Sequence, residues 1–193
     1  MKRPVAAIAA ALTLVLGLSG CGAANGARTQ PEDKTATASQ IPKKNSRGNI
    51  VKHVGDGAGV TGEDGKDVVS WTVTGINLNP QCTESYQAPV KNGHLIALDV
   101  TVSTTPKFKD SEYNPFNIGS GSLWKYIRKD GTVWNGDLLN DSTVSCIPQE
   151  QSLPTDIGPD IKAQGKVILD VPATDGYLVF SQMDKDGWEY PLV

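Results

Sequence analysis

The feature that most constrains the fold is a strictly alternating run of residues near the middle of the chain. Apolar side chains occupy every second position in this run, at Ile96, Leu98, Val100 and Val102. A repeat of two places these side chains on one face of a β-strand, whereas one face of a helix repeats every 3.6 residues. The run therefore predicts a β-strand with one buried face.

Further strand signals recur through residues 67–193, separated by turn residues. They lie at 69–74, 123–128, 132–134, 166–171, 177–180 and 188–192. An Asp-Gly pair at 130–131 supplies the positive φ angles of a tight hairpin turn. The long segment 135–164 is rich in Pro, Asp and Ser, and we expect it to be a crossing loop. About six to eight short strands without a convincing amphipathic helix predict an all-β, antiparallel two-sheet sandwich.

Residues 22–66 differ in composition from the segment that follows them. They contain no Phe, Trp or Tyr and are rich in Ala, Thr, Gly, Lys and Asp. Such a segment buries too little apolar surface to offset the entropy lost on ordering. We therefore expect a flexible, disordered tether over residues 21–66 and a folded domain over residues 67–193. An early edge strand within residues 50–60 is an alternative for the end of the tether.

The N-terminal residues are typical of a targeting signal. Lys2 and Arg3 precede an apolar run over residues 5–18, which is shorter than the ~20 residues that a membrane-spanning helix needs. The run ends in Leu18-Ser19-Gly20-Cys21, which resembles the lipobox of bacterial lipoproteins. This resemblance implies a signal peptide over residues 1–20 and attachment of palmitate-type acyl chains at Cys21. The chain would then be anchored to the cell membrane at its extracytoplasmic face.

Cys82 and Cys146 are the two cysteines that remain after Cys21. An even pair in an oxidising compartment predicts a disulfide bond. Closing a loop of about 65 residues stabilises a fold by roughly 4 kcal/mol on the chain-entropy model. Because no His or further Cys lies at ligand spacing, we do not expect these thiols to bind a metal.

No residue is assigned a catalytic role from the sequence. His94, Asp99 and Ser142 are the residue types of a hydrolase, but no Gly-x-Ser-x-Gly motif surrounds the serine. A polar residue at the start of a strand is the more ordinary interpretation of His94.

We expect neither a metal nor a cofactor. Asp184 and Asp186-Gly187 faintly resemble a calcium loop, but its first and twelfth positions would be Gln182 and Val193, which are not acidic. Residues 67–193 carry a net charge of −7, and this acidity argues against a nucleic acid partner.

The order of several segments in the folded part carries a family resemblance. These segments are residues 68–74, 91–102, 129–131, 161–172 and 177–180. They are similar to a family of bacterial extracellular domains of unknown function related to a mycobacterial secreted immunoprotective antigen. The resemblance implies an immunoglobulin-like sandwich outside the cell. The family has no agreed active site, so it assigns no functional residue to this chain.

Together these features favour a non-enzymatic, lipid-anchored binding or interaction module of the bacterial cell envelope. Its partners would be the membrane, through the lipid anchor, and an unidentified envelope or extracellular protein or ligand. Two alternatives stay open. One is an envelope hydrolase or metal-dependent enzyme using scattered carboxylates, which needs a concave pocket holding at least two carboxylates. The other is a structural or immunity lipoprotein, for example one that excludes superinfection.

Overall fold

The computed structural model describes residues 44–183 and 187–192. In that part of the chain the strands are β1 (Ile50–Val51), β2 (Gly57–Thr61), β3 (Asp67–Asn77), β4 (His94–Thr104), β5 (Trp124–Ile127), β6 (Lys162–Val171), β7 (Tyr177–Phe180) and β8 (Trp188–Pro191). The helical turns are η1 (Pro106–Asp110), η2 (Gly121–Leu123), α1 (Asp141–Val144) and η3 (Gln149–Gln151). The signal peptide and the predicted anchor, Cys21, lie outside the described residues.

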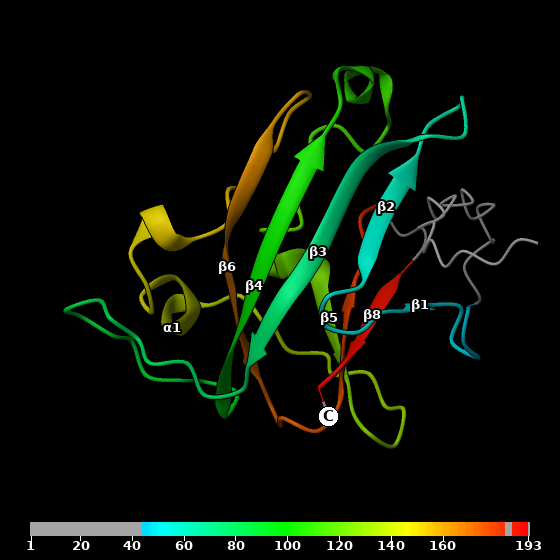
Figure 1. The fold of residues 1–193 in the computed structure, drawn as a ribbon. Helices are drawn as coiled ribbons and strands as arrows, with labels where there is room; N and C mark the ends of the chain where they lie inside the picture. Colours follow the sequence, from blue (N-terminus) through cyan, green and yellow to red (C-terminus); the bar gives the residue numbers. More distant parts are fainter. Residues whose placement is uncertain (1–43, 184–186, 193) are drawn as a thin grey trace, which may run out of the picture. The chain divides into compact units, whose positions relative to one another are not determined.

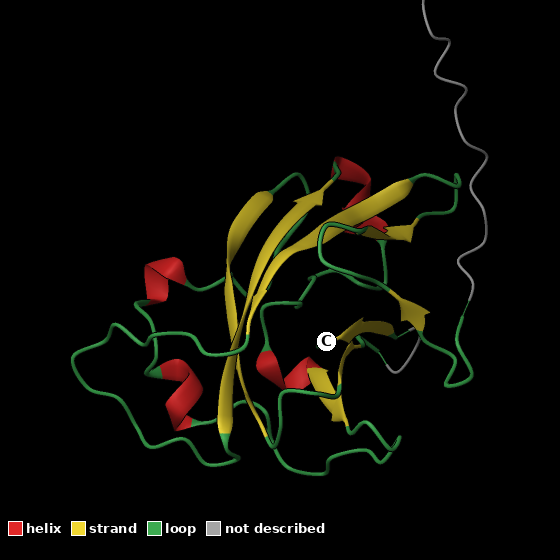
Figure 2. Cartoon of the chain, turned by 60° about the horizontal axis from the view of Figure 1, so that its bottom comes forward, coloured by secondary structure: helices red, strands yellow, loops and turns green. Residues whose placement is uncertain are grey.

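The strands form two sheets that pack face to face (Figures 1 and 2). One sheet has the order β2-β3-β4-β6 and the other the order β1-β8-β7-β5. Neighbouring strands are antiparallel except β1 and β8, which are parallel. The all-β two-sheet sandwich predicted from the sequence is therefore confirmed, although one sheet is mixed and only the other is fully antiparallel.

The alternation in β4 has the predicted consequence for the core. Its four alternating apolar side chains are at most 3% exposed, and they meet apolar side chains of β6 in register, such as Leu169 opposite Ile96. Trp71 of β3 lies across the core and contacts the rings of Phe180 and Trp188 from the other sheet. Its indole Nε1 donates to the Tyr190 hydroxyl at 3.0 Å, so this buried polar group is satisfied.

The folded domain begins earlier than residue 67, which corrects the predicted end of the tether. Residues 50–61 contain β1 and β2. β2 lies at the edge of its sheet, in agreement with the alternative prediction of an early edge strand within residues 50–60. These strands fold without aromatic residues because they attach to the edges of sheets that already exist. Only Ile50, Ala58 and Val60 need to be buried there.

A buried ion pair attaches β1 to the rest of the domain. Glu189 of β8 is 1% exposed and accepts hydrogen bonds from the Arg47 guanidinium and from the side-chain amide of Asn49, both at 2.9 Å. Burial alone raises the pKa of Glu189, but the hydrogen bonds from Arg47 and Asn49 outweigh burial, so the net pKa lies below its ordinary value. The Arg47 guanidinium also lies 4.6 Å from the centre of the Tyr177 ring. We call Arg47 and Glu189 the clasp.

The predicted strand boundaries differ from the structure in the second half of the chain. Residues 132–134 make a single bridge, between Val133 and Ile127, instead of a strand. In the Asp-Gly turn before them Gly131 has the expected positive φ, 91°, whereas Asp130 does not have one. The expected crossing loop holds α1 and η3, and β6 already begins at Lys162. Its early residues escaped prediction because Gln164 and Gly165 interrupt the apolar pattern.

Candidate functional site

Two loops on the outer face of β4 and β6 are joined by the predicted disulfide between Cys82 and Cys146. We call residues 79–93 and 137–148 the stapled loops; they lie together at one side of the domain in Figure 1. The amide of Thr83 donates to the carbonyl of Cys146 at 2.7 Å, and the amide of Ala88 donates to Ser145 Oγ at 2.9 Å. The two loops therefore form one surface.

A small apolar cluster lies beneath this surface, separate from the core between the sheets. Its buried members are Ala97, Cys146, Ile147 and Ile168. Ala97 and Ile168 are opposite each other in the β4–β6 register, on the face of the sheet that points away from the main core. Because the stapled loops cover this pair, β4 and β6 are buried on both faces here.

A buried carboxylate joins the same loops at a second point. Asp170 of β6 is fully buried and accepts hydrogen bonds from the amides of Lys91 and Asn92 and from the side-chain amide of Asn140, at 2.8, 3.1 and 2.9 Å. The Ser142 hydroxyl lies 3.1 Å from the same carboxylate and 2.6 Å from Asn140 Oδ1. Several donors satisfy a buried carboxylate where no cation pairs with it. Asp170 therefore fixes the loops as an internal joint.

The stapled loops carry exposed apolar side chains on this fixed backbone. Nine large apolar side chains are exposed in the part of the chain that the structure describes, and four of them belong to these loops. They are Tyr86 at 74%, Val144 at 67%, Val90 at 44% and Leu139 at 39% exposure. Sequence analysis did not select them, since a lone Tyr or Val gives no sign of whether it faces solvent or a core.

The charged residues of the stapled loops are mostly acidic. Glu84, Asp137 and Asp141 are the acidic residues of the stapled loops, and Lys91 is their basic residue. The Lys91 Nζ lies 4.0 Å from an Asp141 carboxylate oxygen, with both side chains more than half exposed. The stapled loops therefore combine exposed apolar side chains with a net negative charge.

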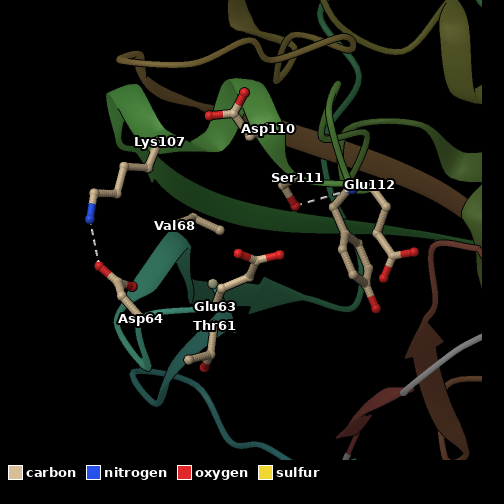
Figure 3. Close-up of a pocket in the computed structure, with 10 residues that line it drawn as sticks. Thr61, Glu63, Asp64, Val68, Lys107, Asp110, Ser111 and Glu112 are labelled. Carbon is tan, nitrogen blue, oxygen red and sulfur yellow. Dashed lines mark hydrogen bonds and ion pairs between the residues drawn. The ribbon is translucent and has the colours of Figure 1, made fainter.

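A second candidate site is a cleft of about 570 Å³ between the β2–β3 turn and η1 (Figure 3). Lys107 and Asp64 close one side of the cleft through an ion pair of 2.6 Å, with Glu112 on the other side and Glu63 between them. The hydrogen bond from Lys107 lowers the pKa of Asp64 below its ordinary value. This concave site with several carboxylates is what the enzymatic alternative requires.

The structure separates the three residues of the hydrolase hypothesis. His94 is exposed at the start of β4, and Asp99 is five positions further along, about 17 Å away and on the opposite face. Asp99 instead forms an ion pair with Lys166, the residue opposite it on β6. Ser142 belongs to the Asp170 joint. Asp99 and Ser142 thus have other partners, and the three residues do not come together.

The segment that faintly resembles a calcium loop has a structural role at Gln182. The Gln182 side chain accepts a hydrogen bond from the Asn117 amide and donates to the carbonyls of Tyr113 and Pro115. Gln182 thus ties β7 to the 113–117 loop, while residues 184–186 lie outside the described residues. Within the described ranges, no three His, Cys, Asp or Glu side chains lie close enough to hold a metal ion.

No family model matches this chain, and no curated protein matches it. Among solved structures it is similar to a secreted protein from Mycobacterium tuberculosis, MPT63, whose crystal structure has 1.5 Å resolution. The sequence identity is 16% and the TM-score 0.47, over 74% of this chain and 97% of that chain. Likeness at this level assigns neither a family nor a function. Of the helices in the described ranges, none is long and apolar enough to span a membrane.

Proposed function

We propose that this chain is a lipid-anchored binding module of the bacterial cell envelope and that the stapled loops contact its partner. The observation that carries the proposal is the exposure of Tyr86 and Val144 on a backbone fixed by a disulfide and by the Asp170 joint. Exposed aromatic side chains on rigid loops give binding energy at low entropic cost, because little ordering is needed on contact. The anchor at Cys21 comes from the lipobox resemblance.

The stapled loops and the start of the described chain belong to different sheets of the domain. The described chain enters through Lys44 and β1, at the edge of the sheet that contains β8. The stapled loops cover β4 and β6 of the other sheet, and they lie on the opposite side of the domain from β1 in Figures 1 and 2. The start of the described chain therefore does not cover the stapled loops.

Site-specific photo-crosslinking in living cells tests the contact. A photoreactive amino acid replaces Tyr86 or Val144 in the full chain, and Val54 and Val133, which are 50% and 49% exposed, serve as control positions. We expect one discrete crosslinked product from positions 86 and 144 and none from the controls. Equal labelling at all four positions, or none at any, would contradict the proposal.

The anchor is tested separately by Cys21→Ser. The variant should lose acyl labelling and leave the membrane fraction, because the thiol that carries the acyl chains is gone. Unchanged retention in the membrane would refute the lipid assignment.

The cleft in Figure 3 supports a second candidate function, an envelope hydrolase that uses carboxylates. Glu63 and Glu112 line its interior, and paired carboxylates act as acid and base in glycoside hydrolysis. Incubation of the full chain with purified cell-wall glycan should then release reducing ends, and Glu63→Gln or Glu112→Gln should abolish the release. If the unaltered chain releases none, this candidate fails.

A further inference from the structure

We propose that the partner of the stapled loops is a protein surface with an apolar recess bordered by Lys and Arg side chains. This inference rests on the proposed function and adds the chemistry of the partner. It follows from the arrangement of apolar and charged side chains on the two loops.

The apolar contacts fall on both stapled loops and beside their joints. Tyr86 lies between Glu84 and Ala88, and the amides of both residues donate to the facing loop, to Cys146 and Ser145. Val144 directly precedes Ser145 on that facing loop. The side chains of Tyr86 and Val144 therefore project from adjacent stretches of backbone. Because Tyr86 and Val144 are 74% and 67% exposed, a partner that buries both side chains needs an apolar recess to receive them.

The charge around these contacts selects a basic partner. Three carboxylates and one lysine lie on the stapled loops, and that lysine, Lys91, is already next to Asp141. The Asp141 side chain is 81% exposed, so its charge faces solvent and any approaching molecule. Complementary potentials increase the association rate, and like charges oppose contact. Lys and Arg at the border of the recess would match the negative charge of the stapled loops. Anionic lipid headgroups or an acidic protein would be repelled by it.

The fixed backbone makes one defined contact more favourable than adaptable binding. The disulfide and the hydrogen bonds of Thr83, Ala88 and Asp170 hold both loops before any partner arrives. Loops that are ordered in advance lose little entropy on binding. Truncation of Tyr86 should therefore remove affinity without any change in the fold.

Two matched peptides provide a direct test with the full chain. One is a soluble amphipathic peptide of Leu and Lys, and the other carries Glu in place of every Lys. By NMR titration, the Leu/Lys peptide should shift the resonances of Tyr86 and Val144, and the Leu/Glu peptide should not. The double variant Tyr86→Ser/Val144→Ser should bind the Leu/Lys peptide about tenfold more weakly, or weaker still. The matched variants Val54→Ser and Val133→Ser should leave the affinity for this peptide unchanged. Added salt should weaken binding several-fold.

Each other occupant gives a distinct result that overturns the inference. Equal binding of both peptides, or shifts spread over the acidic domain outside the stapled loops, would remove the charge argument. Binding to anionic lipid vesicles that depends on Tyr86 would point to a membrane. Concentration-dependent dimers lost in Tyr86→Ser would point to a second copy of the chain. Because photo-crosslinking detects contact with any partner, a crosslink at position 86 combined with failure of the peptide test rejects the partner chemistry alone.

Discussion

The core between the two sheets and the cluster under the stapled loops differ in what holds them together. The core joins residues from both sheets, including Trp71, Ile96 and Phe180, so its strands need no covalent link. The outer cluster has four buried residues, one of which is the disulfide half Cys146. Burial on that scale cannot fix two long loops, so a disulfide and a buried carboxylate supplement it. The sandwich is thus a scaffold stabilised by burial, and the stapled loops are a surface stabilised by specific links.

The largest expected effect comes from the core. Trp71→Ala removes a side chain that is 2% exposed and leaves Tyr190 without its hydrogen-bond donor. We expect a loss of about 5 kcal/mol in the free energy of unfolding, measured by urea denaturation. The partly buried Trp134 is the matched control, and Trp134→Ala should cost less than half as much. Equal costs would show that the core is no more important than the periphery.

The disulfide comes next. In the double variant Cys82→Ser/Cys146→Ser the crosslink across 64 residues is absent, and the chain-entropy model predicts a loss of about 4 kcal/mol. The far-ultraviolet circular dichroism of the sandwich should persist at 20–25 °C, roughly the conditions of the estimate. An unfolded double variant would mean that the sandwich depends on the stapled loops. It would contradict the claim that burial alone stabilises the sandwich.

The clasp should contribute about 3 kcal/mol, since Arg47→Ala leaves the buried Glu189 carboxylate without its ion-pair partner. The value is at the low end of such cases because the Arg47 side chain is 33% exposed. Lys107→Ala, which breaks the exposed ion pair to Asp64, is the control and should cost less than about 1 kcal/mol. Urea denaturation of both variants at pH 7 checks the difference.

The clasp also predicts a pH dependence with a defined sign. The pKa of Glu189 in the folded state lies below the ordinary value of 4.5, so its ionised form stabilises the fold at and above that pH. This contribution is lost as the pH falls below 4.5 through the folded-state pKa. The gap in unfolding free energy between the unaltered chain and Arg47→Ala should therefore shrink in acid. A gap that widens as the pH falls would contradict the assigned shift.

The Asp170 joint should have a smaller effect, confined to the loops. Asp170→Asn places an amide donor where several donors already converge, and we expect a loss of about 2 kcal/mol. NMR should show line changes at Lys91 and Asn140 and few in the main core. Asp99→Asn, which disturbs a half-exposed ion pair, is the control and should leave those lines in place.

The smallest effect on stability is expected at the exposed side chains themselves. Tyr86→Ser and Val144→Ser should change the free energy of unfolding by less than about 0.5 kcal/mol, because both side chains are mostly in solvent. Thermal denaturation checks this. A large loss would mean that these residues are structural and would remove the basis of the proposed contact.

The sequence predicted those features that depend on local pattern. The alternation at Ile96 and Leu98 implied β4 and its buried face, and the two cysteines that remain after Cys21 implied one disulfide. Features that depend on distant partners were not predictable. Asp170 is a single polar residue in an apolar run, and only the folded chain shows that Lys91 and Asn140 converge on it. In the same way, only the folded chain shows that Glu189 of β8 binds Arg47, which precedes β1.

Amide hydrogen exchange of the full chain, before and after reduction of the disulfide, tests the central comparison most directly. Our account predicts that reduction exposes the amides of Thr83, Ala88 and Ser145 to exchange, while the β3 and β4 amides keep their protection. Simultaneous loss of protection in the stapled loops and in β3 and β4 would contradict it, since the loops and the sandwich would then be a single cooperative unit.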